Sequence, residues 1–350
     1  MLEKLYLQNF RNFEKKLIEL SPKTTIILGP NASGKTNILE SIHLLSTGKS
    51  FKARLEEEMI FFDSQIGRVK GKLVDETTLE IVLTKGEITL EDGKNQKTNK
   101  KRLLVNNLGK RLIDFSTNLK TVLFGPWDLD LVTESPHIRR RFLDSVLTQT
   151  DREYYRSLIS YEKALRRRNK LLIRIREEGY PRASLMFWDQ LLIKNGNYIS
   201  DSRSQFIDFV NTTGSLEKKE YSLKYDSSTI SESRLKQYEE EEVAAATTLV
   251  GPHRDDFCFF LTKNSHRRAL DRFGSRGEQR LGVLWLKLAE LDFLEKESNT
   301  TPTLLLDDIF SELDSHNRDL ALTLAQGQQT IITSTEPINL DLPGISQVNL

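Results

Sequence analysis

The chain has little cysteine and no long apolar run, and both shortages narrow what it can be. Its single cysteine, Cys258, among 350 residues excludes an intramolecular disulfide framework and a cysteine-only zinc site, and it fits a reducing compartment. The longest uncharged run, Leu320–Thr335, has 16 residues and contains a Gln-rich break, whereas a membrane-spanning helix needs about 20 mostly apolar residues. Residues 1–16 carry charges where a secretory signal would be apolar. We therefore expect a cytoplasmic protein without a membrane anchor.

The chain also lacks an excess of either positive or negative charge, so its overall composition does not identify a partner. The 51 basic and 50 acidic residues nearly cancel. A disordered chain is excluded as well, because 17 Phe, 9 Tyr and 3 Trp are too many large apolar groups to leave in water. This length suits two or three domains, each with its own core.

The apolar pattern changes along the chain and predicts an α/β protein with a helical insertion. Thr24–Leu28 is typical of a strand, and one clear helix begins near Gly34. After a long stretch with helical spacing, Phe257–Leu261 and Thr303–Leu306 again predict strands, separated by a helix over Gly277–Phe293. We therefore predict two domains: a discontinuous α/β domain of residues 1–125 and 243–350, and an inserted, mostly helical domain of residues 126–242.

A phosphate-binding loop is the strongest chemical signal. Residues 29–36 match G-x-x-x-x-G-K-[ST] at every fixed position and lie between an apolar strand and a helix. Glycines let backbone N–H groups turn towards a β-phosphate, and the helix N-terminus adds its positive dipole end. Lys35 would bridge the β- and γ-phosphates, and the Thr36 hydroxyl would ligate Mg²⁺. The predicted ATP-binding residues are Gly29, Pro30, Asn31, Ala32, Ser33, Gly34, Lys35, Thr36 and Asn37.

Two carboxylates follow a buried strand late in the chain. Thr303–Leu306 is continuously apolar, as a parallel strand buried on both faces would be, and Asp307 and Asp308 come directly after it. Ligands bind at the carboxyl ends of strands in such sheets. We predict that Asp307 holds Mg²⁺, directly or through water, and that Asp308 orients or deprotonates the attacking water. An ordinary strand followed by a turn would have the same sequence pattern, so this prediction depends on the presence of the phosphate loop.

A second helix start begins with Ser275-Arg276-Gly277-Glu278-Gln279. Ser275 followed by Glu278 three residues later is a capping-box pattern, and an amphipathic helix follows. The turn is either only a well-capped helix or a second phosphate site. In the second interpretation, the Ser275 hydroxyl and the N–H groups around Gly277 would bind the γ-phosphate of a nucleotide held by another subunit.

Taken together, the motifs resemble the RecF family of bacterial recombination mediators across almost the whole chain. Their order and spacing are similar to those of ABC-type ATPase heads of the SMC-related kind. The loop, the Ser275 turn and the acidic strand contribute to the resemblance. The other matching segments are Leu7–Phe13, Phe124–Leu129, Arg139–Asp144, Gly251–Asp256 and Ser311–Asp314.

The resemblance implies a fold, cofactors and partners. The fold would be an ABC-type P-loop ATPase head with an inserted α-helical lid, which dimerises on Mg²⁺–ATP and opens after slow hydrolysis. ATP would act as a binding switch, with Ser275 meeting the nucleotide of the partner subunit and Asp314 at the dimer interface. The protein would bind double- and single-stranded DNA at gaps or junctions, work with RecR and RecO, and help to load RecA in recombinational repair and replication restart.

Three positions depart from common family or ABC-type patterns. Ala32 stands where glycine is common, which is harmless only if its φ angle is negative. Asp308 stands where transporter ATPases have glutamate, and the shorter side chain suits slow turnover. Thr333-Ser334-Thr335 occupies the region of a histidine switch but contains no histidine.

Basic residues gather in the predicted insertion. From Pro136 to Glu178 there are 12 Lys+Arg and 6 Asp+Glu, with the densest clusters at Arg139–Arg141 and Arg166–Arg168. Such clusters are either solvated helix faces or a nucleic-acid footprint, and their confinement to one segment of a neutral chain favours DNA. A basic segment at Lys97–Arg102 is a weaker candidate for phosphate contact. We interpret His253 with Asp255 and Asp256 as a structural turn and not a metal site, and we place Trp188 and Trp285 in the core.

Three other functions fit the sequence less well than a DNA-binding mediator does. An SMC-like or break-repair head would need a long coiled coil, and the insertion has no sustained heptads. A nucleotide-binding subunit of a membrane transporter would not explain the basic insertion. A nuclease would need a further carboxylate cluster beyond Asp307 and Asp308.

Overall fold

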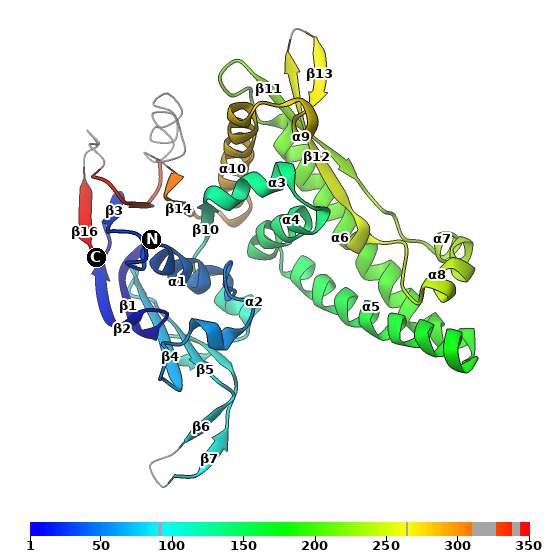
Figure 1. The fold of residues 1–350 in the computed structure, drawn as a ribbon, viewed down its shortest axis with the longest axis horizontal. Coiled ribbons are helices and arrows are strands. Elements are labelled where there is room, and N and C mark those ends of the chain that lie inside the picture. Colours follow the sequence, from blue (N-terminus) through cyan, green and yellow to red (C-terminus); the bar gives the residue numbers. More distant parts are fainter. Residues whose placement is uncertain (90–92, 264, 310–326, 338–343) are drawn as a thin grey trace. The chain divides into compact units, whose positions relative to one another are not determined.

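The computed structural model describes residues 1–89, 93–263, 265–309, 327–337 and 344–350. Its contacts divide the chain into two compact units, Met1–Asp128 with Leu294–Leu350, and Leu129–Phe293 (Figure 1). The first boundary is close to the predicted one. The second differs: residues 243–293 group with the middle of the chain, because β12 pairs with β11 over residues 256–262. The middle unit therefore contains a small sheet as well as helices.

Two sheets form most of the first unit. One is antiparallel, in the order β2-β1-β4-β5-β8-β9, and the other is parallel, in the order β10-β14-β15-β3-β16. The antiparallel strands are β1 (Leu2–Phe10), β2 (Phe13–Glu19), β4 (Ile66–Leu73), β5 (Thr78–Thr84), β8 (Lys101–Val105) and β9 (Leu108–Gly109). The parallel strands are β3 (Thr24–Leu28), β10 (Thr121–Phe124), β14 (Thr303–Asp307), β15 (Thr330–Ser334) and β16 (Ile345–Asn349). The remaining elements are a ribbon of β6 (Glu87–Thr89) and β7 (Asn95–Lys97), and the helices α1 (Lys35–Thr47), α2 (Leu112–Phe115) and η1 (Glu56–Met59).

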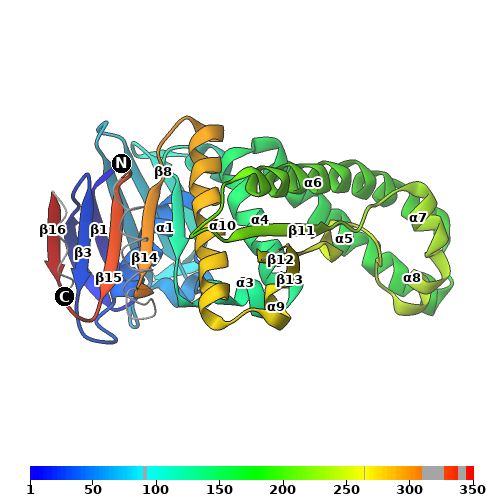
Figure 2. The same cartoon turned by 90° about the horizontal axis from the view of Figure 1, so that it is seen from above.

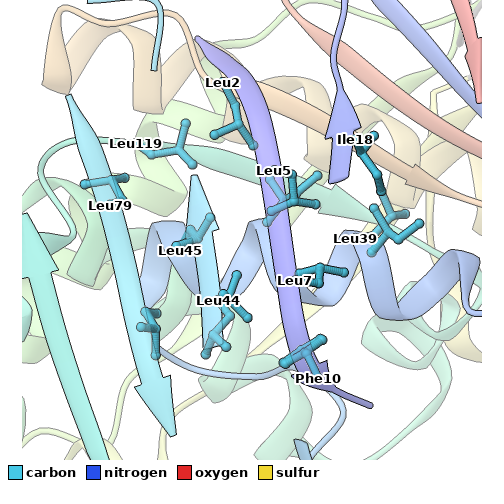
Figure 3. Close-up of a cluster of buried hydrophobic side chains, with 14 of the residues drawn as sticks. Leu2, Leu5, Leu7, Phe10, Ile18, Leu39, Leu44, Leu45, Leu79 and Leu119 are labelled. Carbon is cyan, nitrogen blue, oxygen red and sulfur yellow. The ribbon is translucent and has the colours of Figure 1, made fainter. Parts of the chain in front are cut away.

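The core of the first unit is continuous through α1. This helix contacts β4 and β5 of the antiparallel sheet and β10, β14 and β15 of the parallel sheet, so it is buried around most of its circumference. Figure 3 shows the close-packed leucines of β1, α1 and β5 in this core. Burial on both sides explains why the helix carries apolar residues without a clear polar face.

The parallel sheet places the polar residues of interest at one edge. β3, β14 and β15 are neighbours and are buried at every position (Figure 2). The strands predicted at Thr24–Leu28 and Thr303–Leu306 are confirmed. Because the strands are parallel, their carboxyl ends bring Gly29, Asp307 and Ser334 to the same side.

The second unit consists of long helices and a three-stranded sheet. α5 and α6 pack along each other, and β11, β12 and β13 form an antiparallel sheet with β11 at its edge (Figure 2). The Asp151 side chain caps the first turn of α5, and Gly179 ends the helix in the left-handed conformation. The strands are β11 (Glu220–Asp226), β12 (Asp256–Lys263) and β13 (His266–Ala269). The helices are α3 (Asp130–Thr133), α4 (Pro136–Thr150), α5 (Arg152–Glu178), η3 (Arg182–Leu185), α6 (Met186–Thr212), α7 (Glu232–Gln237), α8 (Glu239–Ala245), η4 (Pro252–Arg254), α9 (Leu270–Phe273) and most of α10 (Arg276–Ser298). The short helix η2 (Pro126–Leu129) lies at the first boundary between the units, and the end of α10 crosses the second.

The buried side chains of the long helices follow a helical spacing. Tyr154, Leu158 and Tyr161 are buried on α5, and Trp285 is buried on α10. Trp188 on α6 is only half-buried, so its placement in the core was wrong. No helix in the described part of the chain is both long enough and apolar enough to cross a bilayer.

Candidate functional site

The loop between β3 and α1 is tightly built around two glycines. Gly34 begins α1 with φ 105°, and a Cβ there would lie 2.6 Å from Phe13 Cζ. At Gly29 an added Cβ would lie 2.5 Å from Ser33 Oγ. Side chains at either position would therefore fill the loop or displace its neighbours, so both glycines of the motif are required by the geometry.

Ala32 adopts the left-handed conformation, with φ 66°. The condition under which alanine would be harmless here, a negative φ angle, is therefore not met. A non-glycine residue in this region costs about 1 kcal/mol or more, because Cβ approaches the neighbouring carbonyl oxygen. The loop thus carries local strain at a position where glycine would be relaxed.

The lysine of the loop is already turned towards the phosphate-binding backbone. Lys35 is 7% exposed, and its Nζ donates hydrogen bonds to the carbonyl oxygens of Gly29 at 2.7 Å and Pro30 at 3.0 Å. Ser33 Oγ is buried and has no hydrogen-bond partner among the described residues. A buried ammonium held only by carbonyls, beside an unsatisfied hydroxyl, is suited to receive an anion with several acceptor oxygens.

The two predicted metal ligands lie together. Thr36 Oγ1 donates to the Asp307 carboxylate, at 2.8 Å from Oδ2 and 3.1 Å from Oδ1. Thr333 Oγ1 donates to Asp307 Oδ1 at 2.7 Å and accepts the backbone N–H of Asp308 at 3.0 Å. Asp307 is almost fully buried, whereas Asp308 follows in the left-handed conformation at φ 49° and is half-buried.

Thr333 was not assigned a role from the sequence. In the sequence it stands in the region where a histidine switch would be. The order of the parallel sheet supplies the missing information, because β15 lies between β14 and β3 and so brings Thr333 beside Asp307. Ser334 follows it and accepts the N–H of Gly29 at 3.3 Å.

The residues present fit a magnesium–triphosphate group. The glycines of the loop leave space that a Cβ atom would fill. Lys35 and the N-terminus of α1 supply positive charge. The buried Ser33 Oγ has no hydrogen-bond partner among the described residues. A hydroxyl and a carboxylate are the hard oxygen ligands that Mg²⁺ prefers, usually with several waters. Among the described residues no group of three or more His, Cys, Asp or Glu could hold a metal ion.

A pocket adjoins the loop on the side of the β1–β2 turn. Its volume is about 830 Å³. Arg11, at the turn, forms a two-pronged ion pair with the buried Glu40 of α1 at 2.6 and 2.8 Å. Asn12 donates to the Ser33 carbonyl at 3.0 Å and accepts from Asn37 at 2.8 Å, which ties the turn to the loop. The lining is of mixed charge: it includes the basic residues Arg11, Lys52 and Lys85, the acidic residues Glu57, Glu58 and Asp63, and also Asn12, Asn37 and Phe62.

The Ser275 turn in the second unit is the predicted capping box. Ser275 N–H donates to Glu278 Oε2 at 2.9 Å, and Glu278 N–H donates to Ser275 Oγ at 3.3 Å. Burial alone would raise the pKa of Glu278, but hydrogen bonds from Ser275 and the nearby Arg268 lower it below its usual value. A Cβ at Gly277 would meet nothing within 4 Å, so the helix start is open. Ser311–Asp314, predicted at a dimer interface, lie outside the described residues.

Half of the arginines in the two densest basic clusters form ion pairs or hydrogen bonds within the second unit. Arg139 pairs with Asp256 at 2.6 Å, Arg140 donates to the Asp255 carbonyl at 2.8 Å, and Arg168 pairs with Asp189 and Glu242, both at 2.6 Å. Arg141, Arg166 and Arg167 are exposed. The exposed part of the two basic clusters is therefore smaller than the composition suggests, and two of its three arginines lie on α5.

The remaining predicted residues have structural contacts. His253 accepts from Tyr161 Oη at 2.7 Å, and its Nε2 lies 3.0 Å from the Thr248 carbonyl, as expected for a structural turn. In the basic segment at 97–102, Lys97 ends β7, residues 98–100 connect the two strands, and Lys101 and Arg102 begin β8. Lys101 pairs with Glu56.

The parallel sheet, its phosphate loop and the acidic strand end define an ABC-type P-loop ATPase head, joined here to an inserted unit rich in helices. The chain matches the family model described as RecF/RecN/SMC N terminal domain over residues 1–340. It is 35% identical to the DNA replication and repair protein RecF of Herpetosiphon aurantiacus over 379 aligned positions, covering 99% of this chain and 96% of that protein. It is 36% identical to the protein of the same name from Natranaerobius thermophilus, covering 99% and 95%. The solved structure of the recombination mediator protein RecF-ATP in the RecFOR pathway aligns with a TM-score of 0.85 at 30% identity, covering 99% of this chain and 95% of that one. The chain belongs to the RecF family.

Proposed function

We propose that this chain binds Mg²⁺–ATP at residues 29–37 and uses slow hydrolysis to switch a DNA-bound dimer during recombinational repair and replication restart. The observation that carries the proposal is the contact between Thr36 Oγ1 and the Asp307 carboxylate. It joins the end of the phosphate loop to the acidic strand end, although the two residues are 271 positions apart in the sequence.

Each residue of the site has a role that follows from its position. Lys35, which now donates to two carbonyls, would hold the β- and γ-phosphates, whose oxygens are stronger acceptors. Thr36 and Asp307 hold Mg²⁺, directly or through water. Asp308 would orient the attacking water, and its backbone is held in the left-handed conformation with its N–H bonded to the Thr333 hydroxyl. Mg²⁺, when bound, would neutralise the charge that develops on the phosphates.

The pocket beside the loop supplies the place for the nucleoside. Asn12 and Asn37 form the wall shared with the loop, and the exposed ring of Phe62 offers an apolar surface for a base. Lys52 and Lys85 lie on the same lining, together with Glu57, Glu58 and Asp63, and would be the cations available there to ribose or α-phosphate oxygens.

In this proposal, the Ser275 turn of a second copy of the chain completes the nucleotide site. Ser275 begins a helix whose N-terminus is open at Gly277, and an anion is favoured there by the helix dipole. In the free chain, the Ser275 hydroxyl donates a hydrogen bond to the Glu278 carboxylate. Engagement of a γ-phosphate would release that hydroxyl, so dimerisation would depend on ATP.

The partners follow from the family. The RecF-ATP structure is described as part of the RecFOR pathway, and we extend RecR and RecO as partners to this chain. DNA at gaps or double-strand/single-strand junctions is the proposed substrate, and loading of RecA onto single-stranded DNA is the proposed outcome.

Hydrolysis with and without DNA tests the proposal. We expect weak ATP hydrolysis by the wild-type chain that rises when gapped or duplex DNA is added. Lys35→Ala should abolish ATP binding, because the phosphate cluster loses its main counter-charge. Lys35→Arg keeps the charge but replaces a compact ammonium with a broad fork, so it should retain some binding and lose most hydrolysis. Indifference to DNA, or wild-type hydrolysis by Lys35→Arg, would contradict the proposal.

A further inference from the structure

One face of α5 carries a row of outward-pointing cations. Lys163, Arg166, Arg167 and Lys170 are spaced three or four residues apart, so they share a face, and all four are exposed. No acidic residue occurs between Lys163 and Arg176. Exposed isoleucines extend the row at each end, Ile159 at 46% and Ile173 at 39% exposure. From Ile159 to Ile173 the row is about 21 Å long, from the rise per helical residue.

The opposite face of the same helix is locked in place. Tyr154, Tyr161 and Leu172 are buried on it. Arg168 also points inward, with its side chain 2% exposed, and pairs with Asp189 and Glu242. The buried ion pairs of Arg168 therefore fix the rotation of α5 about its own axis, and the neighbouring Arg166 and Arg167 point to the exposed side of the helix.

The four cations are available for an external partner. Lys163, Arg166, Arg167 and Lys170 form no ion pair with any residue in the described ranges, whereas other basic residues of α5 do. Arg174 pairs with Glu178 at 2.9 Å, near the far end of the helix. The free charge is thus concentrated in the middle of the helix.

Another basic surface, on the antiparallel sheet of the first unit, differs in this respect. The strand register places Lys4, Arg68, Lys70 and Lys72 on one face of β1 and β4. Three of them are neutralised by neighbouring glutamates: Lys4 by Glu19 at 3.0 Å, Arg68 by Glu80 at 2.9 Å and Lys72 by Glu76 at 2.7 Å. This face has as many cations as the row of four on α5, but three of its cations are paired with glutamates.

We propose that the outward face of α5, formed by Lys163, Arg166, Arg167 and Lys170, binds the phosphate backbone of duplex DNA. This inference rests on the DNA-binding function proposed above and assigns it to a surface. Duplex DNA is favoured because its backbone is a regular line of negative charge, and a straight row of unpaired cations on a fixed helix matches it without reorganisation. Contacts of this kind bind without reading sequence.

The test is the salt dependence of DNA binding by a quadruple variant, Lys163→Gln, Arg166→Gln, Arg167→Gln and Lys170→Gln. Glutamine keeps helix propensity and length while removing the charge. Four phosphate contacts contribute a slope of about −3.6 to log K against log salt, so the wild-type affinity should fall about 10²-fold more than that of the variant between 50 and 200 mM salt. Fluorescence anisotropy with a labelled 30-base-pair duplex, in the presence of ATP, gives both slopes.

The matched control is a quadruple variant of the sheet face, Lys4→Gln, Arg68→Gln, Lys70→Gln and Lys72→Gln, which removes the same charge. It should keep the wild-type slope within about one unit. Unchanged ATP binding and circular dichroism in the α5 variant show that the fold is intact.

The possible results separate the two claims. A wild-type slope retained by the α5 variant overturns the assignment to α5 while leaving DNA binding in place, and it would point instead to an acidic protein as the partner of this face. An equal loss in both variants overturns it too, because only total charge would matter. If the wild-type chain itself does not bind duplex DNA, the proposed function and the inference both fail.

Discussion

His253→Gln should make the stability of the second unit less sensitive to mild acid. Burial lowers the pKa of His253 to about 4; the Thr248 carbonyl opposes this shift, whereas Arg254 and Arg140 add to it. The folded chain therefore keeps this histidine neutral, while the unfolded chain binds a proton below pH ~6.5. Because the unfolded state binds more protons in this interval, stability falls as the pH falls from about 6.5 towards 4.

The magnitude follows from the two pKa values. A difference of roughly 2.5 units corresponds to about 3 kcal/mol in full, and about 2 kcal/mol of it is lost between pH 7.5 and pH 5. Glutamine can still donate to the Thr248 carbonyl but cannot titrate. At pH 7.5 the variant should be less stable by about 1 kcal/mol, because the contact with Tyr161 is weakened.

Urea unfolding at pH 7.5 and pH 5, followed by the fluorescence of Trp188 and Trp285, measures both quantities. The wild-type chain should lose about 2 kcal/mol more than His253→Gln between the two pH values. His137→Gln, which replaces an exposed histidine on α4, is the control and should behave as the wild type does. Equal losses in the wild type and His253→Gln would refute the reasoning, since His253 would then not be the group that resists protonation.

Three further substitutions test the nucleotide site. Ala32→Gly should raise the free energy of unfolding by about 1 kcal/mol, because it relieves the left-handed alanine; no gain in a denaturant titration would contradict the strain. Thr333→Val should lower hydrolysis more than ATP binding, because Asp307 and Asp308 lose the hydroxyl between them, and equal losses in calorimetry and turnover would place Thr333 in the binding surface alone. Ser275→Arg should leave ATP binding by the monomer nearly intact and abolish dimerisation and hydrolysis, and partial activity on mixing it with Lys35→Ala would show that Ser275 acts across the dimer. Weaker ATP binding by the Ser275→Arg monomer would rule out that role.

The chemistry of the loop could be predicted from the sequence because it is local. The motif at residues 29–36, the strand before it and the helix after it are contiguous, and fully apolar runs such as Thr303–Leu306 identify buried parallel strands. The capping box at Ser275 was equally readable, because Ser275 and Glu278 lie within one turn.

What the sequence could not supply depends on contacts between distant residues. Thr333 reaches Asp307 only because β15 is inserted between β14 and β3, and strand order is not a local property. The domain boundary near 293 follows from the pairing of β12 with β11. The inward rotation of Arg168, one position from the outward Arg167, likewise depends on its buried partners Asp189 and Glu242.

The most direct test of the central claim is sedimentation velocity of Asp308→Asn with and without Mg²⁺–ATP. This substitution removes the group proposed to orient the attacking water while leaving Thr36 and Asp307 in place. The account predicts a monomer alone or with ADP, a stable dimer with Mg²⁺–ATP, and no dimer when Lys35→Ala is added. A variant that binds ATP and stays monomeric would contradict the ATP-gated dimer, and a variant that no longer binds ATP would place Asp308 in the metal shell or the fold.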